Sequence, residues 1–188
     1  MNQPPSDAMR VPHQQMQAFL QQAALKAGMP AAHAQLLSQL LVASDLRGVL
    51  SHGSRQMVRY VREIKSGGVN PAPEVKVVRE TPTSVLMDGD AGLGYFPAYE
   101  GTLKVIEKAR QHGTAAMVTR NHGHIGAAGI YARMTLEHDL LTFVTSGVQL
   151  NLRPGDLITR AAGGSPMSFS APTLHEPPIV LDCGVTHG

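Results

Sequence analysis

Residues 84–119 read SVLMDGDAGLGYFPAYEGTLKVIEKARQHGTAAMVT, and this stretch indicates the fold class. Its first five residues predict a strand, and apolar side chains then recur at helical spacing over residues 95–112, the clearest helical pattern in the chain. Gly113 ends this helix, and residues 115–119 predict a second strand. A strand, a helix and a strand in this order are typical of an α/β protein.

The loop before this helix excludes one common kind of nucleotide site. Residues 92–97 read GLGYFP, which approaches a dinucleotide-binding fingerprint but has Pro97 where the third glycine belongs. The sequence also lacks a Walker-type Gly-Lys-Ser/Thr loop and a Gly-x-Ser-x-Gly nucleophile elbow. A standard Rossmann site is therefore not supported.

The segment before residue 70 is expected to be helical throughout. Apolar residues at helical spacing predict a first helix over residues 16–27, stopped at Gly28, and a second over residues 32–46. A third helix is expected after Gly53, closed by Gly67 and Gly68. Residues 70–73 read as a linker, so we expect a domain boundary near residue 70.

Strand patterns dominate the rest of the chain. Residues 75–78, 140–145, 166–171 and 179–182 are strand candidates, and residues 127–138 predict a helix. The expected organisation is a helical domain over residues 1–70 and an α/β domain over residues 71–188.

Composition and charge exclude several kinds of partner. The chain carries 16 Lys and Arg and 14 Asp and Glu, a net charge of +2, without the basic stripe that nucleic-acid binding needs. Apolar runs fall short of the roughly 20 residues of a membrane span, and residues 1–10 lack the apolar centre of a secretory signal. The single Cys183 cannot form an internal disulfide. We therefore expect a cytoplasmic protein without nucleic-acid or membrane partners.

Residues 45–56, DLRGVLSHGSRQ, join the second and third predicted helices and form the first candidate site. Ser51 can bond one imidazole nitrogen of His52 and fix its tautomer, while Arg55 can hold a carboxylate through its bidentate fork. A histidine at such a junction suits a catalytic acid. The alternative is that Ser51 caps the third helix and Arg55 lies in solvent.

Residues 120–129, RNHGHIGAAG, follow a predicted strand and open a predicted helix. Backbone N–H groups at a helix start can receive phosphate oxygens, because Gly126 and Ala127 carry little or no side chain. His124, just before them, could exchange a proton with a reacting oxygen. A His-x-His metal site and a simple glycine-rich turn are the alternatives. We rank the metal site below proton transfer, because no third ligand stands at a recognisable spacing.

A third candidate segment, residues 161–169 with sequence AAGGSPMSF, precedes an apolar strand that ends near Asp182. Asp182 could orient and stabilise a protonated histidine. Alternatively, it begins a turn, which is common for aspartate.

Four stretches taken together resemble the malate/L-lactate dehydrogenase family: residues 45–53, 60–71, 121–131 and the phrase DGDAGLG at 88–94. That family also includes sulfolactate, ureidoglycolate and piperideine-2-carboxylate oxidoreductases, and it differs from the Rossmann-type lactate and malate dehydrogenases. The resemblance runs from about residue 12 to the C-terminus, with the motifs in the family order.

This resemblance implies an N-terminal helical, substrate-side domain packed against a non-Rossmann NAD(P)-binding domain. The second domain is expected to have the mixed or antiparallel sheet of the L-sulfolactate dehydrogenase-like type. The resemblance also implies NAD or NADP as cofactor, a small 2-oxo or 2-hydroxy acid as substrate, and a homodimer with its active site near the subunit interface. Family members are much longer, so we expect a truncated form with an unpaired sheet edge that something must cover.

The resemblance also assigns roles to individual residues. Ser51 and His52 match the family's active-site pair, Asp182 an aspartate that completes a relay, and His124 a histidine assigned as proton acceptor. Which histidine moves the proton is left open. Tyr60 falls at a substrate-side tyrosine. The residues that match cofactor contacts are His124, Ile125, Gly126, Ala127, Ala128, Ser146, Gly164, Ser165 and Pro166.

Two departures from the family pattern concern binding. Gln56 stands where the family has a substrate-binding arginine, and Arg55 precedes it by one position, about 100° around a helix. The substrate carboxylate is therefore expected on Arg55 or Gln56, unless the substrate differs. Residues 163–166 read GGSP where Gly-Thr-Asn-Pro is usual, in the stretch expected to contact the cofactor.

The reaction expected from these residues is reversible hydride transfer between NAD(P) and C2 of a small 2-oxo acid, with His52 or His124 protonating the oxygen. This expectation requires the two imidazoles, 72 positions apart (124 − 52), to converge on one cleft. One rival is a non-catalytic relative or assembly subunit. Another is a metal-dependent hydrolase or lyase using His52, His122 and His124.

Overall fold

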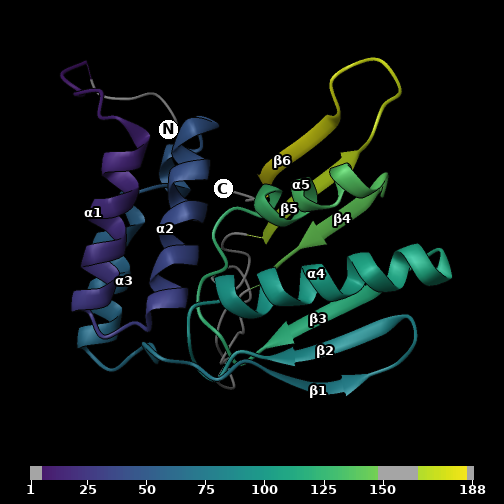
Figure 1. Ribbon diagram of the computed structural model, residues 1–188, viewed down its shortest axis with the longest axis horizontal. Coiled ribbons are helices and arrows are strands. Elements are labelled where there is room, and N and C mark those ends of the chain that lie inside the picture. Colours follow the sequence, from purple (N-terminus) through teal and green to yellow (C-terminus); the bar gives the residue numbers. More distant parts are fainter. Residues whose placement is uncertain (1–5, 148–164, 186–188) are drawn as a thin grey trace, which may run out of the picture.

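The computed structural model describes residues 6–147 and 165–185. Helices α1 (His13–Lys26), α2 (Ala31–Leu46) and α3 (Gln56–Lys65) come first, and two small sheets with their helices follow. Figure 1 shows the three N-terminal helices side by side, with the sheets stacked beside them and the glycine-rich connections lying between the two parts. The expected α/β architecture of N-terminal helices followed by mixed and antiparallel sheets is confirmed.

The N-terminal helices pack around apolar side chains that recur on one face of each helix. Prolines stand immediately before α1 and α2, at Pro12 and Pro30. Gly28, with φ +98°, ends α1 in a left-handed conformation that favours glycine. The core also includes residues at the start of α4: its members include Leu20, Ala24, Leu37, Leu41, Met57, Tyr60, Ile64, Leu93, Tyr95 and Phe96.

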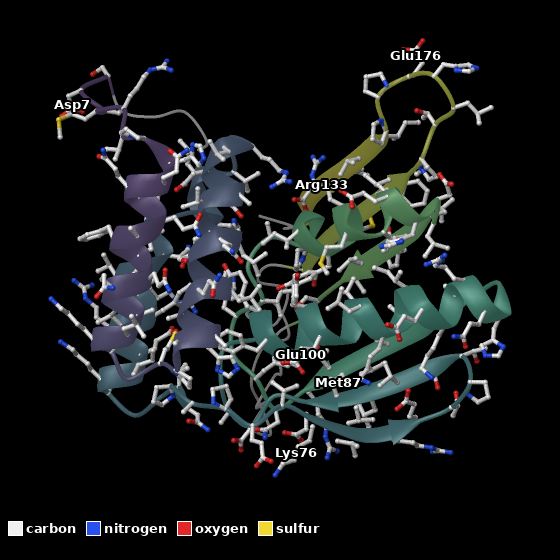
Figure 2. The ribbon with its side chains drawn as sticks, viewed as in Figure 1. Asp7, Lys76, Met87, Glu100, Arg133 and Glu176 are labelled. Atoms are coloured by element: carbon white, nitrogen blue, oxygen red, sulfur yellow. The ribbon has the colours of Figure 1, made fainter. Side chains whose placement is uncertain are left out.

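The first sheet contains β1 (Lys76–Glu80), β2 (Ser84–Asp88) and β3 (Ala116–Arg120). Strands β1 and β2 are antiparallel, while β2 and β3 are parallel and joined through α4 (Tyr95–His112). The buried side chain of Met87 lies on β2 below α4 (Figure 2), where Gly101 leaves room for it. Parallel pairing brings the carboxyl ends of β2 and β3 to the same edge, so the loops that follow them are neighbours.

The second sheet is antiparallel and contains β4 (Thr142–Thr145), β5 (Ser165–Ala171) and β6 (Ile179–Val185), with β5 in the centre. The short helix α5 (Gly129–Met134) packs on this sheet, where Ser170 Oγ donates to Ala132 O at 2.6 Å. Figure 1 shows α5 beside β5 and β6. Strand β6 also contacts α5, and Asp182 in the middle of β6 lies against Gly129 at the start of this helix.

Most predicted elements are confirmed within three residues of their bounds, but the helix predicted for residues 127–138 is wrong in its extent. Helix α5 covers Gly129–Met134, and a separate 3₁₀ turn η2 covers Leu136–His138. The helix begins later than predicted because residues 122–127 form an irregular loop, in which Gly126 has a left-handed φ of +77°. The predicted division of the chain at residue 70 stays a prediction, since the helical core includes residues beyond it.

Candidate active site

The turn that carries His52 is held by Asp45. Its carboxylate Oδ2 accepts the backbone N–H of Ser54 at 2.9 Å, and a side chain at Gly53 would overlap that carboxylate. The turn is a single 3₁₀ segment, η1 (Leu50–His52). Within it, Ser51 Oγ lies 2.9 Å from His52 Nδ1, so the serine orients the imidazole as expected. Ser51 does not cap α3, which has Arg55 at its N-cap and no side-chain cap.

A ladder of backbone hydrogen bonds positions His124. The Gly94 N–H donates to His124 O at 3.0 Å, and the Gly123 N–H donates to Gly92 O at 2.8 Å. Gly94 is required here, because a Cβ at this position would come 2.6 Å from Gly123 O. The two loops are therefore locked together at the carboxyl ends of β2 and β3.

The imidazoles of His52 and His124 meet, although one belongs to the helical segment and the other follows a strand. Their ring centroids are 5.3 Å apart with an interplanar angle of 26°. The convergence predicted from the sequence is therefore present in the structure. Any molecule that touches one ring in this cleft is within reach of the other.

Two buried tyrosines determine which nitrogen of His124 faces outward. Tyr60 Oη lies 2.7 Å from His124 Nδ1 and 3.1 Å from Tyr95 Oη. In the described residues Tyr95 Oη has no other hydrogen-bond partner, so both contacts are satisfied if Tyr95 donates to Tyr60 and Tyr60 donates to Nδ1. Burial raises the pKa of Tyr60 to about 12, which keeps this hydroxyl protonated. In that arrangement the neutral ring carries its proton on Nε2, whereas a proton on Nδ1 would be donated to Tyr60 Oη instead.

Both imidazoles are neutral at pH 7. Burial is the main cause that lowers the pKa of His124 to about 4, and the neighbouring His52 and Arg59 lower it further. Burial also lowers the pKa of His52, opposed by the negative charge of Asp182. At its unprotonated nitrogen a neutral imidazole can accept the proton of a bound hydroxyl group, and the imidazolium so formed can return that proton in the reverse direction.

Asp182, on β6, approaches the cleft from the second sheet. The residue as a whole is exposed, but its carboxylate lies against Gly129 and loses hydration there, which raises its pKa. The Gly129 N–H donates to this carboxylate, so the first backbone donor of α5 is already used. The phosphate site expected at the backbone N–H groups of this helix start stays a prediction.

A cavity of about 650 Å³ opens around the two imidazoles, within the range of small-molecule sites. Most residues that match cofactor contacts line it, whereas Ser165 is exposed and outside the lining, and Gly164 lies outside the described residues. The expected site residues that line the cavity are Ser51, His52, His124, Ile125, Gly126, Ala127, Ala128, Ser146, Pro166 and Asp182.

None of the three residues expected to bind substrate lines the cavity. Tyr60 is buried and acts behind His124, while Arg55 is exposed and does not line the cavity. Gln56 Nε2 donates to Ser51 O at 2.6 Å, which supports the turn that carries His52.

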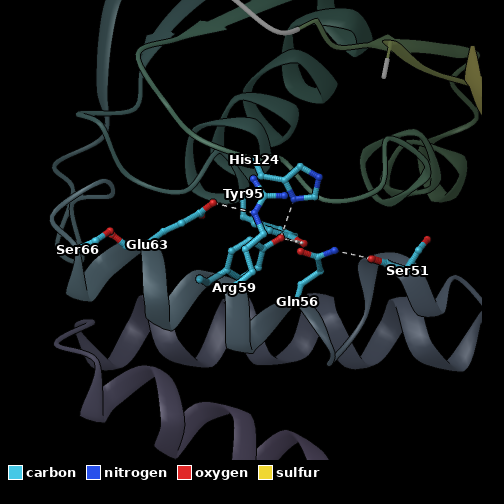
Figure 3. A network of polar contacts seen from close by, with 8 residues as sticks. Ser51, Gln56, Arg59, Glu63, Ser66, Tyr95 and His124 are labelled. Atoms are coloured by element: carbon cyan, nitrogen blue, oxygen red, sulfur yellow. Dashed lines mark hydrogen bonds and ion pairs between the residues drawn. The ribbon is translucent and has the colours of Figure 1, made fainter. Parts of the chain in front are cut away.

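Sequence reasoning missed Arg59 and Tyr95. Arg59 lines the cavity, and Figure 3 shows it near His124 and Tyr95. The stripe of Gln56, Arg59 and Glu63 on α3 was a signal for Arg59.

Within residues 6–147 and 165–185, no group of three or more His, Cys, Asp or Glu side chains could hold a metal ion. His122 instead pairs with Thr119, Nε2 to Oγ1 at 2.8 Å. The same residues contain no helix of the length and apolar character that a membrane span requires.

Comparison with known proteins agrees with this geometry. The family model described as malate/L-lactate dehydrogenase matches residues 11–187, which include every residue of the cleft. The chain belongs to the malate/L-lactate dehydrogenase family. The recognition made from the sequence motifs is therefore confirmed.

The relatives of this chain include malate dehydrogenases and sulfolactate dehydrogenases. The chain is 37% identical to a malate dehydrogenase from Pyrococcus horikoshii over 174 residues, 93% of this chain and 48% of that protein. The solved structure of that species' enzyme has a TM-score of 0.78 at 36% identity, covering 93% of this chain and 50% of the other. The sulfolactate dehydrogenase structure from Methanocaldococcus jannaschii has a TM-score of 0.81 at 25% identity, covering 94% and 51%. The chain thus spans about half the length of these relatives.

Proposed function

We propose that this chain carries the proton-transfer side of an NAD(P)-dependent dehydrogenase that interconverts a small 2-oxo acid and its 2-hydroxy acid. The observation that supports this proposal most is the stacked pair of neutral imidazoles, His52 and His124, in one cavity. Dehydrogenases of malate, sulfolactate and ureidoglycolate among the family relatives support the substrate class.

The residues present fit a nicotinamide ring beside the histidines. Gly126, Ala127 and Ala128 line the cavity with backbone and small side chains, which lets a flat ring approach closely. A Cβ at position 126 would overlap Tyr95, so only glycine fits at this point of the cavity wall. With the remaining expected contacts at His124, Ile125, Ser146 and Pro166, this wall would hold NAD or NADP. When bound, the nicotinamide supplies or accepts the hydride.

The protein's own residues handle the proton. As an imidazolium, His124 can give the proton on Nε2 to the oxygen of a 2-oxo acid, and the ring then returns to its neutral form with Nδ1 against Tyr60. His52, oriented by Ser51 and stabilised when positive by the nearby Asp182, can do the same. The choice between them stays open, and both act by positioning a donor at the reacting oxygen. The division into a substrate-side helical part and a cofactor part, and the homodimer, remain part of the proposal.

A screen of activity tests this function. The 188-residue chain is mixed with NADH or NADPH and a panel of 2-oxo mono- and dicarboxylic acids, and oxidation of the reduced cofactor is followed by absorbance. We expect one cofactor and acid pair to give turnover above background. Absence of turnover with every pair, together with absence of NAD(P)H binding by fluorescence, would contradict the proposal.

The second candidate is a non-catalytic relative or an assembly subunit. The chain covers 48% of the Pyrococcus horikoshii malate dehydrogenase. A non-catalytic chain predicts no fluorescence or thermal-shift response to NADH or NADPH, whereas the dehydrogenase predicts both.

A further inference from the structure

We propose that Arg59 binds the carboxylate of the acid substrate. This inference rests on the proposed function and names the group in the cavity that recognises the substrate class. It assigns the carboxylate to a residue one helical turn beyond Gln56 on α3.

Arg59 supplies the permanent positive charge among the described residues of the cavity. Among the described residues that line it, Arg59 alone is a lysine or arginine, and Asp182 is the acidic residue. The two imidazoles are neutral because burial lowers the pKa of each. An anion that enters the cavity therefore finds its positive partner at Arg59.

The position of Arg59 relative to the histidines suits an acid that carries an oxygen on the carbon next to its carboxylate. Arg59 lines the cavity together with His52 and His124, and its charge helps to lower the pKa of each imidazole. Figure 3 shows Arg59 coming from α3 and paired with Glu63. In a 2-oxo acid the carbonyl carbon is bonded directly to the carboxylate. A carboxylate on Arg59 would therefore present its C2 oxygen toward the imidazoles.

The hydrogen bonds of Arg59 leave the two terminal nitrogens of its guanidinium available for a ligand. Arg59 Nε donates to Glu63 Oε1 at 2.7 Å, an ion pair one turn apart on α3. Within the described part of the chain, the two terminal nitrogens of Arg59 make no hydrogen bond. Two terminal N–H groups in a plane match the two oxygens of a carboxylate. Glu63 is a positioning residue that holds the fork in place.

The neighbours on α3 are less suited to this role. Both Arg55 and Arg59 are exposed residues, but only Arg59 lines the cavity. Gln56 is uncharged, and its amide nitrogen is engaged with Ser51 O. Arg59 therefore brings a positive charge to the cavity from a position three residues after Gln56, where the family has its arginine.

Oxalate, a stable analogue of a 2-oxo acid, is the probe for this inference. Binding is measured by isothermal titration calorimetry on the whole 188-residue chain, with and without NADH. We expect Arg59→Gln to weaken oxalate binding about tenfold or more, because a charge-assisted hydrogen-bond pair is lost. Arg59→Lys should retain part of the affinity, since it keeps the charge but loses the fork. Arg62→Gln, the same charge change on the exposed side of α3, should bind as the wild type does.

The outcomes separate this inference from the proposed function. Loss of oxalate binding in Arg59→Gln supports the inference even if no acid is turned over. Oxalate binding by Arg59→Gln at wild-type affinity, loss on Arg55→Gln instead, or no oxalate binding by the wild type would each overturn it. Where turnover is found, Arg59→Gln should raise KM for the acid far more than for its primary amide, while NADH affinity is unchanged. A merely structural role would not produce that difference.

Discussion

Tyr60 shows how a single buried hydroxyl can define a catalytic group. It lies 2.7 Å from His124 Nδ1 and 3.1 Å from Tyr95 Oη, so one nitrogen of the imidazole is occupied inside the protein. The other nitrogen is left for the cavity. The same packing that holds the ring also removes water from it, and this burial lowers the pKa of His124 to about 4.

This lowered pKa predicts a pH-dependent loss of stability. Between pH 6.5 and 4 the unfolded chain binds a proton at His124 that the folded chain does not bind, so the free energy of unfolding falls as the pH falls. From pH 7 to pH 5 this one group should contribute a loss of about 2 kcal/mol. The measurement is urea unfolding of the wild type and His124→Gln at both pH values, with the wild type losing more.

Other groups cancel in this comparison, because both proteins carry them. An equal pH dependence in the two proteins would show that His124 titrates near the usual histidine range. That result would remove the argument that the imidazole is neutral and ready to exchange a proton at physiological pH.

At the residue scale, part of the site could be predicted from the sequence. Ser51, His52 and His124 stand in short, distinctive motifs, and the structure brings them together. Arg59 was missed because α3 carries several arginines, and sequence alone could not show which one faces the cavity. The position of Tyr95 behind His124 depends on contacts between distant segments, which local patterns do not contain.

At the scale of elements, the loops after β2 and β3 position the chemistry. Their backbones are joined by four hydrogen bonds, from the N–H groups of Gly89, Ala91, Gly94 and Gly123. Gly94 lies where the loops approach most closely, and a Cβ there would come 2.6 Å from Gly123 O, His122 Nδ1 and Ile125 Cγ2. Glycine is thus needed at this position for packing, although its φ of −66° is ordinary.

Substitution of this glycine tests the role of the loop pair. Gly94→Ala should destabilise the fold by about 1–3 kcal/mol through overpacking against backbone that cannot move aside easily. Chemical denaturation gives this value. Gly68→Ala is the matched control, because its added Cβ would meet Glu63 O at an ordinary 3.4 Å. Equal stability of the two variants would contradict the close approach of these loops.

Helices and strands were predicted correctly where the spacing of apolar residues and the residues that end an element agreed. The strand Ser84–Asp88 and the helix Tyr95–His112 were predicted with their observed bounds. The helix expected at residues 127–138 is shorter, and an irregular loop with Gly126 at a left-handed φ of +77° precedes it. Ala127 and Ala128 favour a helix locally, but the helix begins only after them, at Gly129.

At the scale of the whole molecule, the helical core and the two sheets meet at the cavity. His52 and Arg59 come from the helical part, His124 follows the first sheet, and Asp182 belongs to the second. Val118 on β3 and Phe143 on β4 are 62% and 58% exposed, so each sheet carries uncovered apolar side chains. The chain spans about half the length of its relatives, and the activity of the whole family enzyme therefore remains a proposal for this chain.

The central claim is that His52 and His124 serve one reaction in one cavity. The most direct test is a double-mutant cycle of kcat/KM with His52→Ala, His124→Ala and the double variant, using the cofactor and acid pair found in the screen. We predict that each single change lowers kcat/KM by about 10²–10⁴-fold. The double change should cost less than the product of the single losses, because the two groups act together. Wild-type turnover by both single variants would contradict the account.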